Sequence, residues 1–254
     1  MKNLIVLIFI FCITGKILGQ KEKEGRFKNY FGLVFSPVIP NNFIGIKTLA
    51  VQDTSSVMTT TYNQKWSFQF GAIARFGLSE KFSLETGLIS VRRIYDVNVS
   101  IPDSSINRSQ KLTYINYDLP INGLFYVRMS DKIYANAYLG VSFVHYPSDV
   151  MDSVQLGSGK SIVYSGLRFD LTYFGFNAGI GAEYRTEKAG TFYIGGAAKV
   201  YSKPVLAGVA SLKTSGTSDV IRTVRSIPGG YFSIDIRYFF PYIKSKKEQN
   251  NPLN

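Results

Sequence analysis

The residues that could carry out chemistry are few, and the first to consider is the single histidine. His145 is the only imidazole in the chain, and Ser148 follows it three residues later. A histidine that takes the proton of a serine hydroxyl turns that hydroxyl into a nucleophile for acyl transfer. Pro147 stands between the two and ends an extended segment, so the side chains need not share a face. We therefore expect His145 to be an aromatic residue at the rim of a strand, and the sequence predicts no catalytic residue.

Metal and cofactor sites are not predicted either. The single cysteine, Cys12, lies in an apolar run near the N-terminus, and one histidine does not supply the ligands of a transition metal. Asp149 and Asp152 are near enough to suggest calcium, but close acids in a polar segment are more often simply solvated. The glycines lie within strands or hairpin turns and form no phosphate-binding loop. The sequence thus predicts a protein without a metal or cofactor.

The clearest pattern in the chain is the alternation of apolar and polar residues with a period of two. Within 65–78, aromatic residues and alanines alternate with serine, glutamine, glycine and arginine. This period is typical of strands with one apolar face. The composition, with 15% aromatic residues and 23 glycines, also favours an all-β fold. Eight strands are predicted, near 27–39, 65–78, 82–95, 112–129, 133–146, 169–185, 191–204 and 229–242.

The connections between these strands alternate in length. Three of them, at 79–81, 130–132 and 186–190, are short and polar. The other four are long and rich in Ser, Asn, Asp, Thr and Gly, and they cover 40–64, 96–111, 147–168 and 205–228. This order is typical of an antiparallel up-and-down barrel with long loops outside the cell and short turns in the periplasm. Eight strands return both termini to the periplasmic side.

The first twenty residues have the layout of a secretory signal peptide. A basic start is followed by the eleven-residue apolar run 4–14, which is too short to span a bilayer as a helix. We predict a signal peptide at 1–20, a barrel domain at 21–243 and a polar basic tail at 244–254. Removal of Lys2 and Lys16 with the signal lowers the net charge from +12 to +10. An exported chain with its cations dispersed over several segments is not expected to bind nucleic acid.

A secreted soluble barrel or sandwich would also alternate, so the environment of the apolar face needs separate evidence. The polar faces carry few charges, whereas a solvated surface is normally rich in Lys and Glu. The apolar faces end in aromatic residues, as the girdles of outer-membrane barrels do. These residues are Trp66, Phe82, Tyr117, Tyr184, Phe192 and Tyr238. The sequence therefore favours a transmembrane barrel, with outer-membrane lipids and lipopolysaccharide around it.

If the polar faces line the lumen, the charges on them point inward. Three bases and four acids are placed there, which is close to neutral, and buried charges are costly unless they pair. The predicted lumen network is Arg75, Glu85, Asp118, Glu183, Lys199, Asp235 and Arg237. The interior of an eight-stranded barrel is largely filled by side chains. We therefore predict a plugged, salt-bridged lumen.

Several segments resemble a family of small outer-membrane barrels. The stretch 114–124, with Asp118 and Pro120 among apolar residues, is similar to the fourth-strand motif of the PorT-like barrels of Bacteroidota. The segments 31–33, 82–88, 179–184 and 236–240 resemble the same family in order and spacing. The basic tail beyond residue 243 departs from the pattern. The resemblance implies an outer-membrane barrel, and for members close to PorT itself a role in a secretion and gliding apparatus.

Three functions follow from this fold. The first is a structural or interaction component of the envelope that binds a partner, for example within a secretion complex, after insertion by the barrel-assembly machinery. The second is a narrow channel or transporter for small solutes. The third is a lipid-modifying enzyme with His145 on the outer wall. The nearly neutral lumen favours the first function over the second, and the lone histidine disfavours the third.

Overall fold

The computed structural model describes residues 29–241, apart from 158, 187 and 217–219. The predicted signal peptide, 1–20, and the predicted tail, 244–254, lie outside the described residues. Among those described, no helix has the length and apolar character needed to cross a bilayer. The described chain contains a 3-10 turn, η1 (Pro102–Ser104), and fourteen strands. The strands are β1 Tyr30–Ile39, β2 Thr48–Gln52, β3 Thr59–Gln64, β4 Ser67–Gly77, β5 Phe82–Ile101, β6 Ile106–Arg128, β7 Ile133–His145, β8 Val150–Gly157, β9 Lys160–Leu167, β10 Thr172–Thr186, β11 Gly190–Tyr201, β12 Leu206–Thr214, β13 Val220–Ile227 and β14 Tyr231–Phe239.

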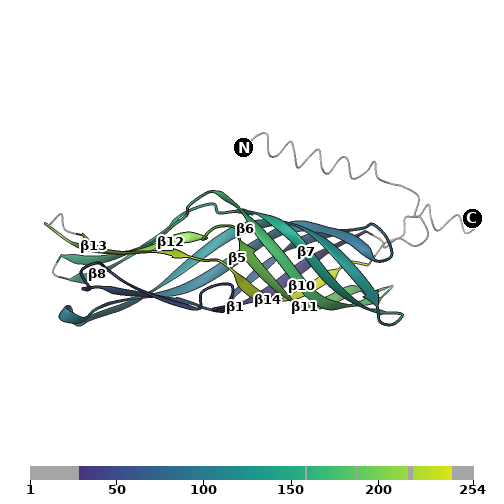
Figure 1. Ribbon diagram of the computed structural model, residues 1–254, viewed down its shortest axis with the longest axis horizontal. Coiled ribbons are helices and arrows are strands. Elements are labelled where there is room, and N and C mark those ends of the chain that lie inside the picture. The colour runs from purple at the N-terminus through teal and green to yellow at the C-terminus, as the bar shows by residue number, and fades with distance from the viewer. Residues whose placement is uncertain (1–28, 158, 187, 217–219, 242–254) are drawn as a thin grey trace, which may run out of the picture.

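Eight of these strands hydrogen-bond in a closed antiparallel ring. Its order is β5-β4-β1-β14-β11-β10-β7-β6, and the pairing of β6 with β5 completes the circle. Strands β4 and β10 lie four places apart in either direction and so face each other across the ring. A sheet closed on itself in this way is a β-barrel, and its strands are tilted in Figure 1.

The prediction of eight strands is wrong for the chain as a whole. The ring strands coincide with the eight predicted segments, but β2, β3, β8, β9, β12 and β13 form where long loops were expected. The predicted loop 96–111 is instead the continuation of β5 and β6, which stay paired up to Ile101 and Ile106. The physical reason is that alternate residues of these segments pack into a core between two sheets, for example Val150 and Val154 of β8 and Ile162 and Tyr164 of β9. Such residues favour strands once a second sheet is present to cover them.

The three short connections all lie at one end of the ring. Ser79 Oγ accepts the backbone N–H of Phe82 at 3.1 Å, and Ser130 Oγ accepts that of Ile133 at 3.2 Å. Gly190 has a φ of +84°, which glycine adopts without strain. The start of β1 is at the same end, because Gly32 pairs with Phe239 near the end of β14. The prediction of tight turns at 79–81, 130–132 and 186–190 is confirmed, and we call this end of the ring the turn end.

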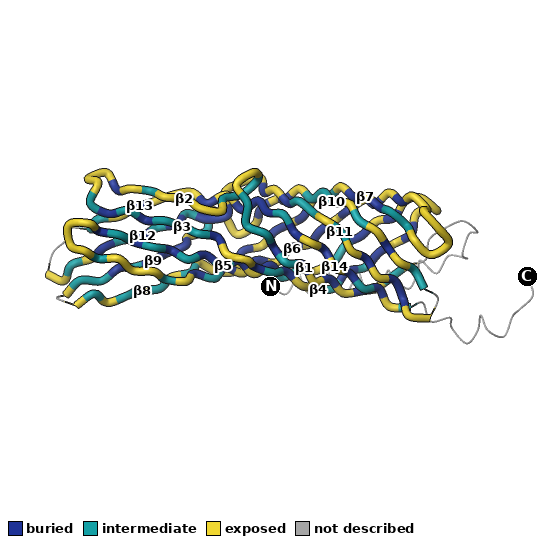
Figure 2. The backbone as a smooth tube through the Cα atoms, turned by 90° about the horizontal axis from the view of Figure 1, so that it is seen from below, coloured by how far each residue is buried: buried dark blue, intermediate teal, exposed yellow. Residues whose placement is uncertain are grey.

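Beyond the opposite end, the chain continues as an extension made of two sheets (Figure 1). One sheet consists of β2, β3 and the outer parts of β5 and β6, and the other has the order β13-β12-β9-β8. The sheets meet through side chains: Thr223 Oγ1 donates to Thr60 Oγ1 at 2.7 Å, and the Gln110 amide binds Asp152. The extension thus lengthens the molecule along the ring axis (Figure 2).

An apolar core fills the space between the two sheets of the extension. Val97, Val99 and Ile101 of β5 are buried in the same cluster as Ile162 of β9 and Leu212 of β12. Tyrosines of one sheet pack directly against glycines of the other. A Cβ atom added to Gly166 would lie 2.0 Å from the Tyr114 hydroxyl, and one added to Gly208 would lie 2.6 Å from the Tyr62 ring. Burial raises the pKa of Tyr114 and of Tyr62, so both phenols stay neutral. The extension therefore packs like the interior of a soluble β-sandwich.

Candidate functional site

The two faces of the longest strands exchange polarity between the extension and the ring. In the extension part of β6, Leu112 and Tyr114 are buried while Ser109 and Lys111 are exposed. From Ile115 to Val127, the exposed positions are apolar and the buried ones include Asn116, Asp118 and Asn122. Figure 2 shows the regular alternation of buried and exposed residues on which this comparison rests.

The same exchange occurs along β5. Phe82 and Leu84 are exposed and Glu85 is buried in the ring part, whereas Arg92 is exposed and Val97 is buried further on. In water, a strand turns its apolar face inward along its whole length. The ring and the extension are therefore built for different surroundings.

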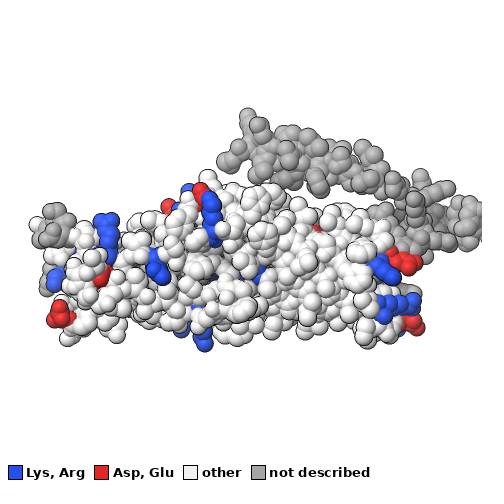
Figure 3. Space-filling view, viewed as in Figure 1, with Lys and Arg blue, Asp and Glu red and all other residues white. Residues whose placement is uncertain are grey.

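The exposed apolar residues of the ring form a continuous band, which we call the apolar belt. Its members are Phe31, Leu33, Phe35, Phe70, Phe76, Phe82, Leu84, Leu88, Ile115, Tyr117, Leu119, Ile121, Phe125, Val127, Leu139, Val141, Phe143, Phe174, Phe176, Ile180, Tyr184, Phe192, Ile194, Ile234, Ile236 and Phe240. Figure 3 shows the ring surface almost free of charge on this face, with charges at both ends. On β6 the belt extends from Ile115 to Val127, a distance of twelve residues. Because the strand is tilted, this corresponds to a height of roughly 30 Å along the barrel axis. That height matches the apolar core of a bilayer.

Aromatic side chains concentrate at the turn end of the belt. The rings of Phe82 and Phe125 lie 5.2 Å apart, and Tyr238 lies 5.1 Å from Phe192 and 5.3 Å from Phe240. At the other end, Trp66 is 63% exposed, and Phe143 and Phe174 lie 5.0 Å apart. Tyr117 and Tyr184 are exposed as well. The six aromatic residues predicted to end the apolar faces all have outward-facing positions, with Tyr238 half-buried.

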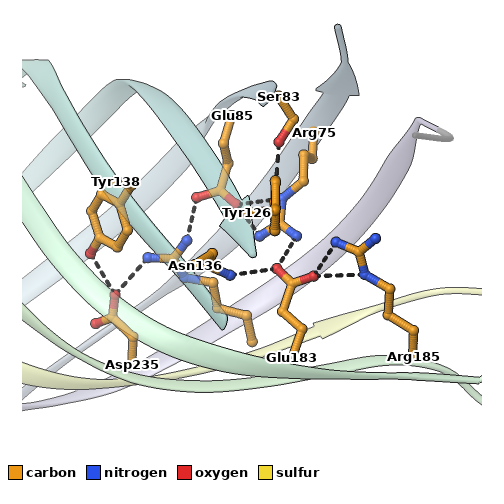
Figure 4. Close-up of polar contacts among 10 residues, drawn as sticks. Arg75, Ser83, Glu85, Tyr126, Asn136, Tyr138, Glu183, Arg185 and Asp235 are labelled. Carbon is orange, nitrogen blue, oxygen red and sulfur yellow. Dashed lines mark hydrogen bonds and ion pairs between the residues drawn. The ribbon is translucent and has the colours of Figure 1, made fainter. Parts of the chain in front are cut away.

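Inside the ring, charged residues bridge opposite walls (Figure 4). Arg75 on β4 donates to Glu183 on the facing strand β10 at 2.5 Å and to Glu85 on β5 at 2.7 Å. Glu85 also accepts from Arg237 of β14 at 2.5 Å, and Arg237 reaches Asp235 at 2.7 Å. All five side chains are at most 5% exposed. This chain of charges crosses the bore.

Neutral groups and one more cation complete this chain. The Tyr138 hydroxyl donates to Asp235 at 2.9 Å, and the Asn136 amide donates to Glu183 at 2.9 Å. Arg185, nearer the turn end, donates to Glu183 at 2.8 Å and is 13% exposed. Glu183 and Asp235 therefore have both charged and neutral donors, and Glu85 has two charged ones, an arrangement that offsets the cost of burial.

The remaining two predicted lumen residues form a separate pair. Lys199 of β11 donates to Asp118 of β6, three strands away around the ring. Ser142 accepts from Lys199 at 3.2 Å, and Asn116 donates to Asp118 at 2.5 Å. The structure thus places all seven predicted lumen residues in the interior, as two clusters.

Two cations of the interior were missed by the sequence argument, Arg93 and Arg185. Arg93 is 1% exposed on β5 and follows Arg92, which is exposed. Adjacent residues of a strand point to opposite faces, so the pair Arg92-Arg93 already implied one inward guanidinium. Arg185 follows the same parity as Glu183 and could have been found in the same way. With these two, five bases stand against four acids.

The bore leaves little free space. A cavity in its middle, lined by Gln69, Pro120, Asn122, Asn177 and Lys199 among others, offers about 50 Å³ to the centres of water molecules. That is room for a few waters. The charged chain lies toward the turn end from this cavity, and the apolar core of the extension lies on the other side. The described residues therefore form no wide passage along the axis.

The residues considered first for chemistry do not assemble into a site. His145 is exposed at the end of β7, between Tyr117 and Thr172, and Ser148 lies beyond the strand. Asp149 binds Arg168, whereas Asp152 binds Gln110. No group of three or more His, Cys, Asp or Glu able to hold a metal occurs in the described part of the chain.

Comparison with known proteins bears on the fold. No protein-family model matches the chain, and no curated protein sequence matches it. The crystal structure of outer membrane protein OprG from Pseudomonas aeruginosa matches 87% of this chain and 98% of its own, with 14% identity and a TM-score of 0.51. Two further matches are the β domain of the Bordetella autotransporter BrkA (10% identity, 86% and 100% covered, TM-score 0.33) and an outer membrane channel from Pseudomonas putida F1 (11%, 87% and 98%, TM-score 0.26). The likeness to OprG supports an all-β barrel fold, and membership of the PorT-like family stays a prediction.

The charged chain can be tested at Glu85, which holds two arginines. Glu85→Gln removes the buried negative charge that Arg75 and Arg237 share. We expect the free energy of unfolding to fall by about 3–5 kcal/mol. Urea unfolding of the refolded protein, followed by tryptophan fluorescence, measures this. The matched control is Glu80→Gln in the exposed turn 79–81, where the change should stay within about 0.5 kcal/mol. Equal effects of the two variants would contradict the assignment.

Proposed function

We propose that the chain is an integral outer-membrane β-barrel of a Gram-negative bacterium, with the ring in the bilayer. The observation that carries this proposal is the exchange of polarity along β5 and β6. An exposed apolar belt would drive aggregation in water, whereas hydrocarbon around it removes that cost. Because the ring has no free edge, all its strands can pair within the membrane.

The direction of insertion follows from the two ends. Outer-membrane barrels have short turns on the periplasmic side and long segments outside the cell. In this proposal the turn end, with the start of β1 and the end of β14, faces the periplasm, and the extension stands outside the cell. A signal peptide at 1–20 accounts for export, and the barrel-assembly machinery for insertion.

The filled bore supports an interaction role over transport. Cross-wall bridges occupy the periplasmic half of the lumen, and the apolar core of the extension closes the outer half. The exposed wall of the extension is a polar surface. It carries the exposed cations Arg108, Lys111, Lys213, Arg222 and Arg225. Lipopolysaccharide phosphates or an envelope partner are the ligands we assign to this surface.

The finer assignment is a PorT-like accessory of a secretion complex. It rests on the sequence resemblance. The long extension, which this proposal places outside the cell, supplies a surface that a partner protein could bind. A narrow channel is the second candidate, and the small central cavity is the feature that favours it. A lipid-modifying activity has less support, since His145 and Ser148 share no hydrogen bond in the described chain.

The membrane environment is tested by placing a cation on the belt. Leu139 on β7 is 74% exposed, so Leu139→Arg would be harmless in water. In a bilayer it should cost about 2–4 kcal/mol of unfolding free energy. Val224, 54% exposed on β13 of the extension, supplies the control, and Val224→Arg should be nearly neutral. Urea titration of both variants refolded into lipid vesicles gives the comparison. Two neutral variants would argue for a soluble protein.

The closed lumen is tested by electrical recording. Insertion of the purified full-length protein into planar bilayers should give no stable, reproducible channels, because charged side chains bridge the bore. Protease protection of reconstituted vesicles verifies that insertion has occurred. Large, uniform conductance steps from inserted protein would overturn the interaction role and favour the channel.

A further inference from the structure

Among the described bases of the interior, Arg93 is the one whose charge no acid balances. The four interior acids, Glu85, Asp118, Glu183 and Asp235, are each bound to another base of the described chain. Arg93 is 1% exposed, and none of its three guanidinium nitrogens has a hydrogen-bond partner among the described residues. The interior therefore holds an uncompensated positive charge with all its donors unused.

Tyrosine rings surround this guanidinium. Its central carbon lies 4.9 Å from the ring centre of Tyr201 and 5.0 Å from that of Tyr231. Cation–π attraction of this kind offsets only part of the hydration that a buried guanidinium loses. Tyr95 and Tyr146 also interact electrostatically with Arg93, and their buried hydroxyls lack hydrogen-bond partners too. Arg93 and the hydroxyls of Tyr95, Tyr146 and Tyr201 thus have no acceptor among the described residues, whereas the Tyr231 hydroxyl donates to Gln69 Oε1 at 2.8 Å.

We propose that Arg93 and its tyrosines form a buried binding site for a small inorganic anion of the size and charge of a halide. A halide accepts several N–H and O–H bonds at once and restores neutrality. The surroundings limit its size: a Cβ on Gly229 would already lie 2.8 Å from Arg93 Nη1 and 2.1 Å from Val205. The central cavity of about 50 Å³, which Tyr231 lines and Arg93 does not, holds no more than a few waters, so a site beside Arg93 has to be small.

The position of the site suggests what the anion does. Arg93 lies on β5 between the ion pairs of the ring and the apolar core of the extension, opposite Tyr114 on β6. An anion here would join the polar lumen to the apolar cap by binding the unpartnered donors Arg93 of β5 and Tyr201 of β11. It would be a structural ion that stabilises the closed state of the lumen.

The test is crystallographic. Crystals of the full-length protein are soaked in sodium bromide, and anomalous scattering is measured at the bromine edge. The expected result is an anomalous peak within hydrogen-bond reach of the Arg93 guanidinium. Water density alone at this place, or no density, would overturn the proposal. A peak confined to exposed surface arginines would count against it equally.

A solution measurement keeps the test independent of crystals. At constant ionic strength, replacing gluconate by chloride should raise the Tm of the wild-type protein saturably by several degrees. Arg93→Met should abolish this shift, and the adjacent exposed Arg92→Met should retain it. If Arg93→Met does not fold, the wild-type response and the bromide map still decide. Absorbance of a tyrosinate near neutral pH would show that a phenolate balances Arg93, and would contradict the anion site.

Discussion

The eight ring strands turn their polar side chains inward, and those side chains have to satisfy one another because little water reaches them. Arg75 meets this requirement by bonding Glu183 on the facing wall, and Glu85 does so by holding Arg75 and Arg237 together. Each of these ion pairs joins two different strands, so together they stabilise the ring from inside. With the polar groups committed to the bore, the outer face is left to apolar residues.

The extension has the opposite arrangement, with apolar residues inside and polar residues outside, so the two faces of a strand change character where the ring meets the extension. Its residues bury apolar side chains such as Val99 and Ile162 between two sheets, and expose polar ones. The same strands, β5 and β6, serve both parts, so one continuous hydrogen-bonded hairpin fixes the position of the cap over the ring. Charged side chains fill the bore toward the turn end and the apolar core fills it toward the extension, which supports the proposed interaction role.

Alternation with a period of two was enough to locate the ring strands and their inward charges, because register and parity are local properties. The same reasoning could not anticipate β12 or β9, whose Ser and Gly residues are typical of loops when considered alone. At Gly166 and Gly208, Tyr114 and Tyr62 from the other sheet occupy the space that a side chain would need, a contact that the sequence alone does not show. Arg93 was not predicted as a lumen residue because it lies near the end of the predicted strand 82–95, next to a second arginine that faces outward. The pairing of charges across the bore depends on ring closure, which no short stretch of sequence encodes.

The central claim is that water surrounds the extension and hydrocarbon surrounds the ring, with the boundary crossing β6 between Thr113 and Tyr117. Spin labels on single cysteines at successive outward positions of β6, in protein refolded into bilayers, measure this directly. Labels at 107, 109 and 111 should collide with a water-soluble nickel chelate, and labels at 117, 119 and 121 should collide with oxygen while excluding the chelate. Uniform access of the chelate along the whole strand would contradict the account.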